Sequence, residues 1–317
     1  MSNARVRTIG LHIADVLGRY VDAIPEGQGL TLLDEIKLTV AGTAAAPAVN
    51  LARLGVPIAT TGVVGEDALG QFVRDQMTRE GVDVSGLRSS AAAPTSASML
   101  NIRRDGSRPA LHVVGANGQI SADDLGDSIL EGIEHIHLGG VGLMPGIDGD
   151  TSVEFLRRAK DRGITVTVDL LPTDGGASDH AALDPILPLI DYILPSDDDS
   201  LLLTGAETYA DAARWFLDRG VGTAIITLGA EGVSISSGDS IDVRYPTTTV
   251  DVVDTTGCGD AFAAGFIRGL LDGEPVEEAA RLGMACGSLV ATGLGSDAGL
   301  ESYEQANEFR KQHIPTV

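Results

Sequence analysis

The sequence predicts an α/β fold in which a mostly parallel β-sheet is sandwiched by helices. Helical and β-rich segments alternate along most of the chain from residue 44 onward, which is typical of βαβ units. The run "TIGLHIADV" (8–16) is almost wholly apolar, as expected for a strand that is buried on both faces. With 317 residues and a hydrophobic content of 43%, the chain can bury a large core, and we expect one main domain over residues 1–317.

The first part of the chain combines that buried strand with segments of a smaller sheet. Residues 17–23 and 32–40 are extended stretches joined by the turn-rich "IPEGQG", with no helix between them, so we expect an antiparallel pair. Residues 95–115 contain another extended pair around Asp105-Gly106, a hairpin signal. We expect about 16–41 and 95–115 to form a small antiparallel β lid over the crevice at the strand ends.

The remaining elements follow in regular order. We expect helices at 44–55, 67–81, 151–163 and 209–220, and strands at 58–65, 135–140, 164–171 and 223–229. The β-branched "TTTVDVV" (247–253) predicts a further strand before a glycine turn and a helix from about Ala261. This order gives a strand, a tight turn and a helix N-terminus late in the chain.

Charge and cysteine content exclude several classes of function. The net charge of −23 argues against nucleic acid and anionic membranes as partners, because both are bound through clustered Lys and Arg. There are only three lysines, so cationic chemistry must come mostly from arginine or a metal. The two cysteines lie far apart without metal-type spacing, which favours a reduced, cytoplasmic protein, and the N-terminal run is neither a signal peptide nor a membrane span.

The stretch "VDTTGCGDAFAAGF" (253–266) predicts an anion site. Gly257 and Gly259 let backbone amides approach a ligand, and the N–H groups and dipole of the following helix favour a phosphate. Asp260 would repel a bound phosphate, so its presence needs a reason, such as taking a proton from the group that attacks that phosphate.

The same residues resemble the C-terminal signature of the phosphofructokinase B, or ribokinase-like, carbohydrate kinases. Further similar segments run along the chain in order, namely "AGTAAAPAVNLARLG" (41–55), "VVGEDALGQFVRDQMTREGVDVSGL" (63–87) and "ITLGAEG" (226–232). The resemblance implies a ribokinase-like fold with a β lid, and an ATP-dependent kinase that phosphorylates a primary hydroxyl of a sugar or sugar-like acceptor. It implies that Asp260 is the general base and that the amides of Gly257, Cys258 and Gly259 form an anion hole.

The resemblance also assigns the ATP and metal sites. In "LPSDDDSLLLTG" (194–205), Ser196, Asp197 and Asp199 stand where the family has Asn-Glu-x-Glu, which organises Mg²⁺ and phosphate through water. A helix cap at Ser196 with acids in the first turn explains this pattern equally well. Thr227, Gly229 and Gly232 match nucleotide-binding positions, although a plain hairpin is the alternative. Asp254 and Thr256 match positions that bind potassium in many members, and Asp254 could equally be a turn former. The small-residue helical segment 284–295 would flank the adenine.

The acceptor end departs from the family pattern. Asp15 ends the predicted first strand, where the family uses an aspartate to bind sugar hydroxyls. Gly42 and Thr43 match the paired-glycine region, with Ala41 in place of its first glycine. The usual sugar-binding asparagine falls on Ala46, and Asn50, one helical turn further on, is a candidate replacement. The acceptor therefore need not be ribose.

Other functions remain open at the level of the sequence. A nucleoside kinase would want an aromatic stacking partner, and the lid segments supply only Tyr20. A non-catalytic sensor would have no use for Asp260, and a dinucleotide oxidoreductase is disfavoured because Phe262 takes the third glycine position of the fingerprint. Residues 103–108 carry three arginines, Arg103, Arg104 and Arg108, that form either a solvated tip or a contact to an anionic acceptor or to the nucleotide phosphates. By analogy with the family, the lid would also pair two subunits in a homodimer.

Overall fold

The computed structural model describes residues 3–104, 107–173 and 175–316, which form two sheets and the helices around them. The strands are β1 (Val6–Gly10), β2 (Ile13–Arg19), β3 (Glu35–Ala41), β4 (Ile58–Gly65), β5 (Asp83–Ser90), β6 (Ala97–Ile102), β7 (Ala110–Val113), β8 (His135–Val141), β9 (Thr165–Leu170), β10 (Tyr192–Ile193), β11 (Thr223–Thr227), β12 (Val233–Ser237) and β13 (Ser240–Tyr245). The α-helices are α1 (Ala45–Arg53), α2 (Ala68–Arg79), α3 (Asp150–Asp161), α4 (Ala177–Leu183), α5 (Asp197–Thr204), α6 (Tyr209–Leu217), α7 (Cys258–Leu271), α8 (Val276–Val290) and α9 (Tyr303–His313).

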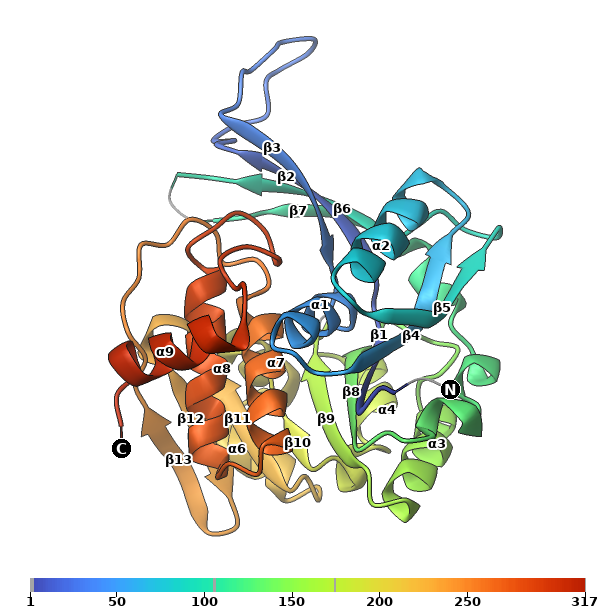
Figure 1. Ribbon diagram of the computed structural model, residues 1–317, viewed down its shortest axis with the longest axis vertical. Coiled ribbons are helices and arrows are strands. Elements are labelled where there is room, and N and C mark those ends of the chain that lie inside the picture. The colour runs from blue at the N-terminus through green and yellow to red at the C-terminus, as the bar shows by residue number, and fades with distance from the viewer. Residues whose placement is uncertain (1–2, 105–106, 174, 317) are drawn as a thin grey trace.

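The large sheet has the strand order β13-β12-β11-β10-β9-β8-β1-β4-β5. All neighbouring strands from β11 to β5 are parallel, and β12 and β13 extend the sheet as antiparallel strands. One face packs against α1, α2, α7, α8 and α9, and α3, α4 and α6 share the apolar core of the other face (Figure 1). The structure therefore confirms the predicted α/β sandwich. No helix in the described part of the chain is long and apolar enough to cross a membrane.

The predicted first strand at 8–16 is in fact two strands that belong to different sheets. β1 ends at Gly10, whose φ of +139° and close approach to the Gly139 carbonyl admit no side chain, and β2 begins at Ile13 in the small sheet. Between them His12 is fully buried, with its ring nitrogens 2.9 Å from the Gly10 carbonyl oxygen and 2.8 Å from Thr60 Oγ1. The prediction was wrong because both strands are buried, so hydropathy alone does not mark the crossing.

The small sheet has the order β3-β2-β6-β7 and lies over the carboxyl ends of the parallel strands (Figure 1). The β2–β3 and β6–β7 pairs are antiparallel as predicted, and β2 pairs with β6 in parallel. The predicted turn at Asp105-Gly106 lies outside the described residues. Leu17, Leu100 and Ile102 pack with Leu294, which fastens the inner face of this sheet to the main body of the protein.

Residues 247–253, predicted as a strand, form none. They run from the end of β13 to the start of α7 alongside α8, where the Val253 N–H donates to the Ala291 carbonyl at 2.8 Å. The β-branched residues keep the backbone extended, but the large sheet ends at β13 and gives them no partner strand. Residues 247–250 instead line a cavity described below.

Candidate active site

The glycine turn before α7 presents free amides to open space. Gly257 caps the helix with φ +79°, and a Cβ on it would lie 2.3 Å from the Cβ of Ser296, so only glycine fits there. The N–H groups of Gly257 and Gly259 have no hydrogen-bond partner among the described residues, and the Cys258 N–H makes only a 3.3 Å bond to the Thr255 carbonyl. A Cβ built on Gly259 would meet no atom within 4 Å. The helix N-terminus is thus open to an anion.

Asp260 lies in the first turn of the same helix and has the properties of a general base. Its Oδ1 is buried without a hydrogen-bond partner among the described residues. Burial and then the negative charge of Asp15 raise its pKa, and the guanidinium of Arg108 lowers it; together these effects bring the pKa to about 7. A carboxylate that titrates near neutral pH is well matched to accepting a proton from a hydroxyl group.

Asp15 faces the same place from the small sheet, and not from the end of the first strand as predicted. It lies in β2 with 5% of its surface exposed, and its Oδ1 also has no hydrogen-bond partner among the described residues. Burial raises its pKa and a hydrogen bond from Ser98 lowers it, with a net value of about 6. The charge of Asp15 raises the pKa of Asp260, so these two carboxylates from distant parts of the chain lie near each other.

A third carboxylate, Asp169, was missed by the sequence reasoning. It lies near the end of β9, and burial followed by the charges of Asp260 and Asp199 holds its pKa well above the ordinary range. Asp169 therefore connects the general-base candidate electrostatically to the acidic start of α5. The signal that drew attention to Asp15, an acid near the carboxyl end of a buried strand, also applies to "TVTVDL" and could have found it.

The acidic start of α5 has the cap that the alternative interpretation predicted. Ser196 is the N-cap, accepting from the Asp199 N–H at 3.2 Å and donating to Asp199 Oδ2 at 2.6 Å. Burial, then Asp198 and Asp197, raise the pKa of Asp199. Crowded, partly desolvated carboxylates favour a cation, so these residues fit Mg²⁺ held through water. The described residues hold no cluster of three or more direct metal ligands.

Asp254 accepts hydrogen bonds that hold the residues just before the glycine turn against residue 295. Its Oδ1 accepts hydrogen bonds from the backbone N–H and the hydroxyl of Thr256 at 3.0 and 2.8 Å, and its Oδ2 accepts one from Gly295 N–H at 2.9 Å. It is 3% exposed and forms no ion pair among the described residues. A buried carboxyl group whose hydrogen-bond donors among the described residues are all neutral fits a monovalent cation beside it.

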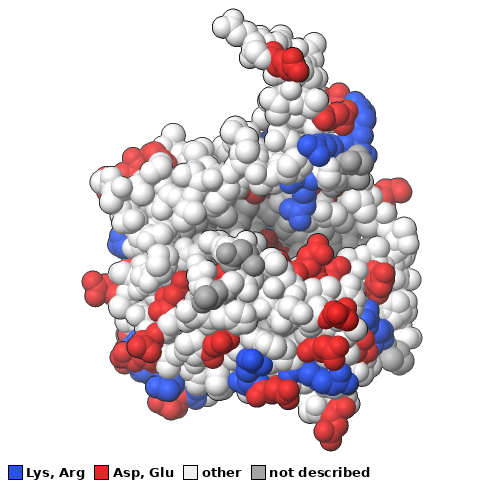
Figure 2. All heavy atoms as spheres, turned by 180° about the vertical axis from the view of Figure 1, so that it is seen from behind, with Lys and Arg blue, Asp and Glu red and all other residues white. Residues whose placement is uncertain are grey.

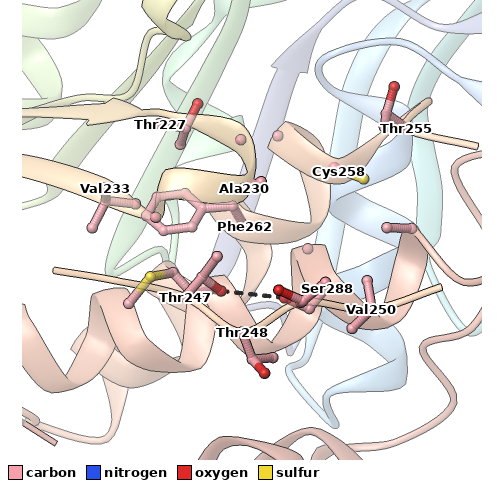
Figure 3. A pocket seen from close by; sticks show the side chains of 17 residues that line it. Thr227, Ala230, Val233, Thr247, Thr248, Val250, Thr255, Cys258, Phe262 and Ser288 are labelled. Atoms are coloured by element: carbon pink, nitrogen blue, oxygen red, sulfur yellow. Dashed lines mark hydrogen bonds between the residues drawn. The ribbon is translucent and has the colours of Figure 1, made fainter. Parts of the chain in front are cut away.

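A cavity of about 230 Å³ opens beside the turn (Figure 3). Its lining includes the predicted nucleotide positions Thr227, Gly229 and Gly232 together with Cys258 and Gly259 of the turn. Ser196, at the start of α5, pairs with Thr227 through an isolated β-bridge, so the acidic helix adjoins this cavity. The structure therefore brings the predicted nucleotide residues and the anion turn to one place.

The far wall of the cavity comes from residues that the sequence reasoning assigned only in part. From the 284–295 segment, Met284, Gly287, Ser288 and Ala291 line it, as expected for residues that flank a planar base. Phe262 and residues 247–250 also line the cavity, and Thr247 Oγ1 lies 3.4 Å from Ser288 Oγ (Figure 3). The lining is predominantly apolar, which suits an aromatic ring system.

The predicted acceptor residues around α1 lie in a tightly packed connection. Gly42 has φ +101°, and a Cβ on it would lie 2.5 Å from the carbonyl oxygen of Leu11. This contact places Gly42 and Thr43 beside the segment that leads into β2 and Asp15. Thr43 Oγ1 has no described partner, and neither amide atom of the fully buried Asn50 has one. Asn50 lies in the interior of α1.

The three arginines of the small sheet have different surroundings. Arg104 pairs with Asp22 at 3.3 Å and stacks on Tyr20, with its guanidinium carbon 4.5 Å from the ring centre. Among the described residues, the side chain of Arg103 hydrogen-bonds only to Ser107. Arg108 instead reaches the main body, where its Nε donates to Thr255 Oγ1 at 3.0 Å. Figure 2 shows basic side chains at the rim of a hollow in which acidic side chains lie.

His135 and His137 act as core residues. Both are buried, and both lie within hydrogen-bond distance of Thr167 Oγ1. Burial lowers the pKa of His135 to about 3 and that of His137 to about 4, so both rings are neutral at physiological pH.

Comparison with known proteins gives a consistent result. The chain is 31% identical over 310 residues to aminoimidazole riboside kinase of Salmonella typhimurium, covering 92% of this chain and 93% of that protein. It is 28% identical over 280 residues to ribokinase of Haemophilus influenzae, covering 86% and 88%. The structure of Arabidopsis thaliana ribokinase complexed with ribose and ATP superposes with a TM-score of 0.82 at 24% identity, covering 97% of this chain and 99% of that one. Residues 3–302 match the family model described as pfkB family carbohydrate kinase, and the chain belongs to this family of sugar kinases.

Proposed function

We propose that the protein transfers the γ-phosphoryl group of ATP to a primary hydroxyl of a sugar or sugar-like acceptor. The observation that carries this proposal is the pair formed by Asp260, with its raised pKa, and the amides of Gly257 and Gly259, which have no hydrogen-bond partner in the described part of the chain and lie at the start of the same helix. In the transfer, the bond between the γ-phosphorus and the bridging oxygen of the β-phosphate breaks and a bond to the acceptor oxygen forms. The hydroxyl proton passes to Asp260, and ADP leaves.

The surrounding residues divide the work of binding. Thr227, Gly229 and Gly232 hold the nucleotide in the cavity, and the amides of residues 257–259 stabilise the charge on the transferring group. Asp15 accepts hydrogen bonds from acceptor hydroxyls, with Gly42, Thr43 and Asn50 as further acceptor contacts. Asp197 and Asp199 bind Mg²⁺ through water. When bound, Mg²⁺ neutralises charge on the nucleotide phosphates.

We further propose that Asp254 and Thr256 support a potassium ion. Asp254 already connects Thr256 to Gly295, so a cation beside it would stiffen the turn that carries the amides. The test is a comparison of the transfer rate in K⁺ and in tetramethylammonium at equal ionic strength. Equal rates in the two salts would refute the potassium site.

We propose that the chain works as one domain whose small sheet, about residues 16–41 and 95–115, is a lid that excludes water during transfer. The outer face of this sheet also fits a second copy of the chain. Leu38, Val16, Met99 and Leu111 form a continuous cross-strand row, and Met99 and Leu111 are 56% and 58% exposed. Sedimentation of the protein and of Met99→Glu tests this, because a lid-paired dimer becomes a monomer in the variant and an unchanged mass refutes the pairing.

The acceptor is identified by an ATP-consumption screen with pentoses, hexoses, sugar acids, sugar phosphates and nucleosides. Asp260→Asn is the matched control, because it keeps the shape of the base and removes its proton affinity. Acceptor-dependent ADP formation that the variant loses supports the proposal. Failure of every acceptor to stimulate ADP formation, with nucleotide binding intact, would contradict it.

A nucleoside acceptor is the second candidate, because the Salmonella relative is named for a riboside. In the structure, Tyr20 stacks with Arg104 and Arg19 and is thus engaged within the small sheet. Because Tyr20 already stacks on these two arginines, it is not available to stack on a nucleobase, and this favours a sugar as the acceptor. Calorimetric binding of adenosine or inosine tighter than of any sugar in the screen would decide for the nucleoside.

A further inference from the structure

Arg108 is the one arginine of the 103–108 segment that leaves the small sheet and contacts the proposed transfer site. Its Nε donates to Thr255 Oγ1 at 3.0 Å, and Thr255 lines the nucleotide cavity just before the glycine turn. Among the described residues, its two terminal nitrogens have no hydrogen-bond acceptor and it forms no ion pair. The contact to a neutral hydroxyl leaves most of the donor capacity of the guanidinium unused.

The electrostatics of the site show where this charge acts. The positive charge of Arg108 lowers the pKa of Asp260, of Asp15 and of the Cys258 thiol, so it lies near the base, the acceptor side and the amide turn together. Lys37, which lies in β3 of the small sheet, is engaged with Asp297 at 2.6 Å. The amides of the turn carry only partial positive charges. Arg108 therefore supplies a full positive charge beside the place where the phosphoryl group is transferred.

We propose that Arg108 is a catalytic residue through which the small sheet binds the γ-phosphoryl oxygens of ATP. This inference rests on the proposed kinase function and adds a residue to its site. A guanidinium offers paired donors in a planar fork that matches phosphate oxygens. The neighbouring Thr255 and Cys258 belong to the nucleotide cavity, which favours the γ-phosphoryl group over an anionic group on the acceptor.

The test compares two nucleotides that differ in the γ-phosphate. Binding of Mg·ADP and of the Mg complex of the non-hydrolysable ATP analogue AMP-PNP is measured by calorimetry, which needs no acceptor. Arg108→Gln should weaken AMP-PNP binding about 10- to 100-fold and change ADP binding less than about 2-fold, as expected for loss of charge-assisted hydrogen bonds. Arg108→Lys should bind AMP-PNP with an affinity between those of the parent and Arg108→Gln, because lysine keeps the positive charge but lacks the planar pair of donors.

Two further variants separate this role from a structural one. Arg103 lies in the same segment, and its side chain hydrogen-bonds, among the residues that the structure describes, only to Ser107; Arg103→Gln should therefore bind both nucleotides as the parent does. Thr255→Val removes the acceptor of the Arg108 bond, and it should retain the preference for AMP-PNP over ADP. If Arg108 only latches the sheet, Arg108→Gln and Thr255→Val will weaken both nucleotides alike, and the inference is wrong.

Two other outcomes also overturn it. Unchanged AMP-PNP binding in Arg108→Gln, with weaker binding of an anionic acceptor, would make Arg108 an acceptor-binding residue. Failure of the parent to bind either nucleotide would overturn the proposed kinase function and this inference with it. Normal binding by the parent with an equal loss for both nucleotides in the variant overturns the inference alone.

Discussion

Replacing Asp260 with Asn should slow phosphoryl transfer and raise the free energy of unfolding at the same time. The carboxylate is held where its pKa is about 7 against an ordinary value of 3.8. Above pH 7 the folded protein must carry this charge in an unfavourable place, whereas the unfolded chain carries it in water. The asparagine removes that cost and, with it, the proton acceptor.

The magnitude follows from the shift. About three pKa units at about 1.4 kcal/mol each give an upper limit of roughly 4 kcal/mol, and partial exposure of the side chain reduces this to about 2–4 kcal/mol. Below pH 3.8 both states are protonated and the cost vanishes, and it grows as pH rises toward 7. The gain in the variant should therefore be full at pH 8.5 and about half as large at pH 5.5.

Urea unfolding at these two pH values, without nucleotide, measures the effect, and exposed Asp251→Asn is the control. The same samples should show a transfer rate at least about 100-fold below the parent for Asp260→Asn. In the parent, activity should rise with pH through about 7 as the base loses its proton. A variant that is no more stable at pH 8.5 than at pH 5.5, or one that keeps the parental rate, would refute the reasoning.

Three other predictions come from single features. Asp15→Asn removes a charge that raises the pKa of Asp260, so the acid limb of the pH–rate profile should move down by up to about one pH unit; an unmoved limb would show that the two groups are uncoupled. Gly257→Ala should cost at least about 2 kcal/mol more than Gly273→Ala in thermal unfolding, because both have positive φ but only the first meets a neighbouring side chain; equal costs would contradict the close contact. Burial lowers the pKa of His12 from 6.5 to about 4, so the parent should lose about 3 kcal/mol as pH falls through that range while the unfolded chain takes up the proton. His12→Asn should lack this part of the slope, and an unchanged slope would contradict it.

The elements of the large sheet could be predicted because alternating apolar strands and amphipathic helices leave a local pattern. The failures lie where extended backbone and strand pairing differ. Residues 247–253 have strand-forming side chains, but hydrogen bonding to a neighbour decides whether a strand exists, and the sequence does not show the neighbour. The prediction of a single strand at 8–16 failed for a similar reason: both halves are buried, but they belong to different sheets.

The candidate site could be inferred from the sequence where one short segment contains it, and could not where folding brings distant residues together. The turn at 257–260 contains its own glycines and acid, so its chemistry can be read locally. Asp169 was not singled out, and Arg108 was named only together with Arg103 and Arg104, because packing is what brings β9 and the small sheet to the same turn. Nothing in the residues around Arg108 distinguishes it from Arg103 and Arg104.

The apolar contact of Leu17, Leu100 and Ile102 with Leu294 has a consequence for how the protein is made. The ribosome releases the first three residues long before the fourth, so the early strands emerge with their inner face uncovered. That face finds its cover only when translation is nearly complete. A nascent chain arrested before residue 294 should therefore expose this apolar face to chaperones. The enzyme can complete its fold only at the end of its synthesis.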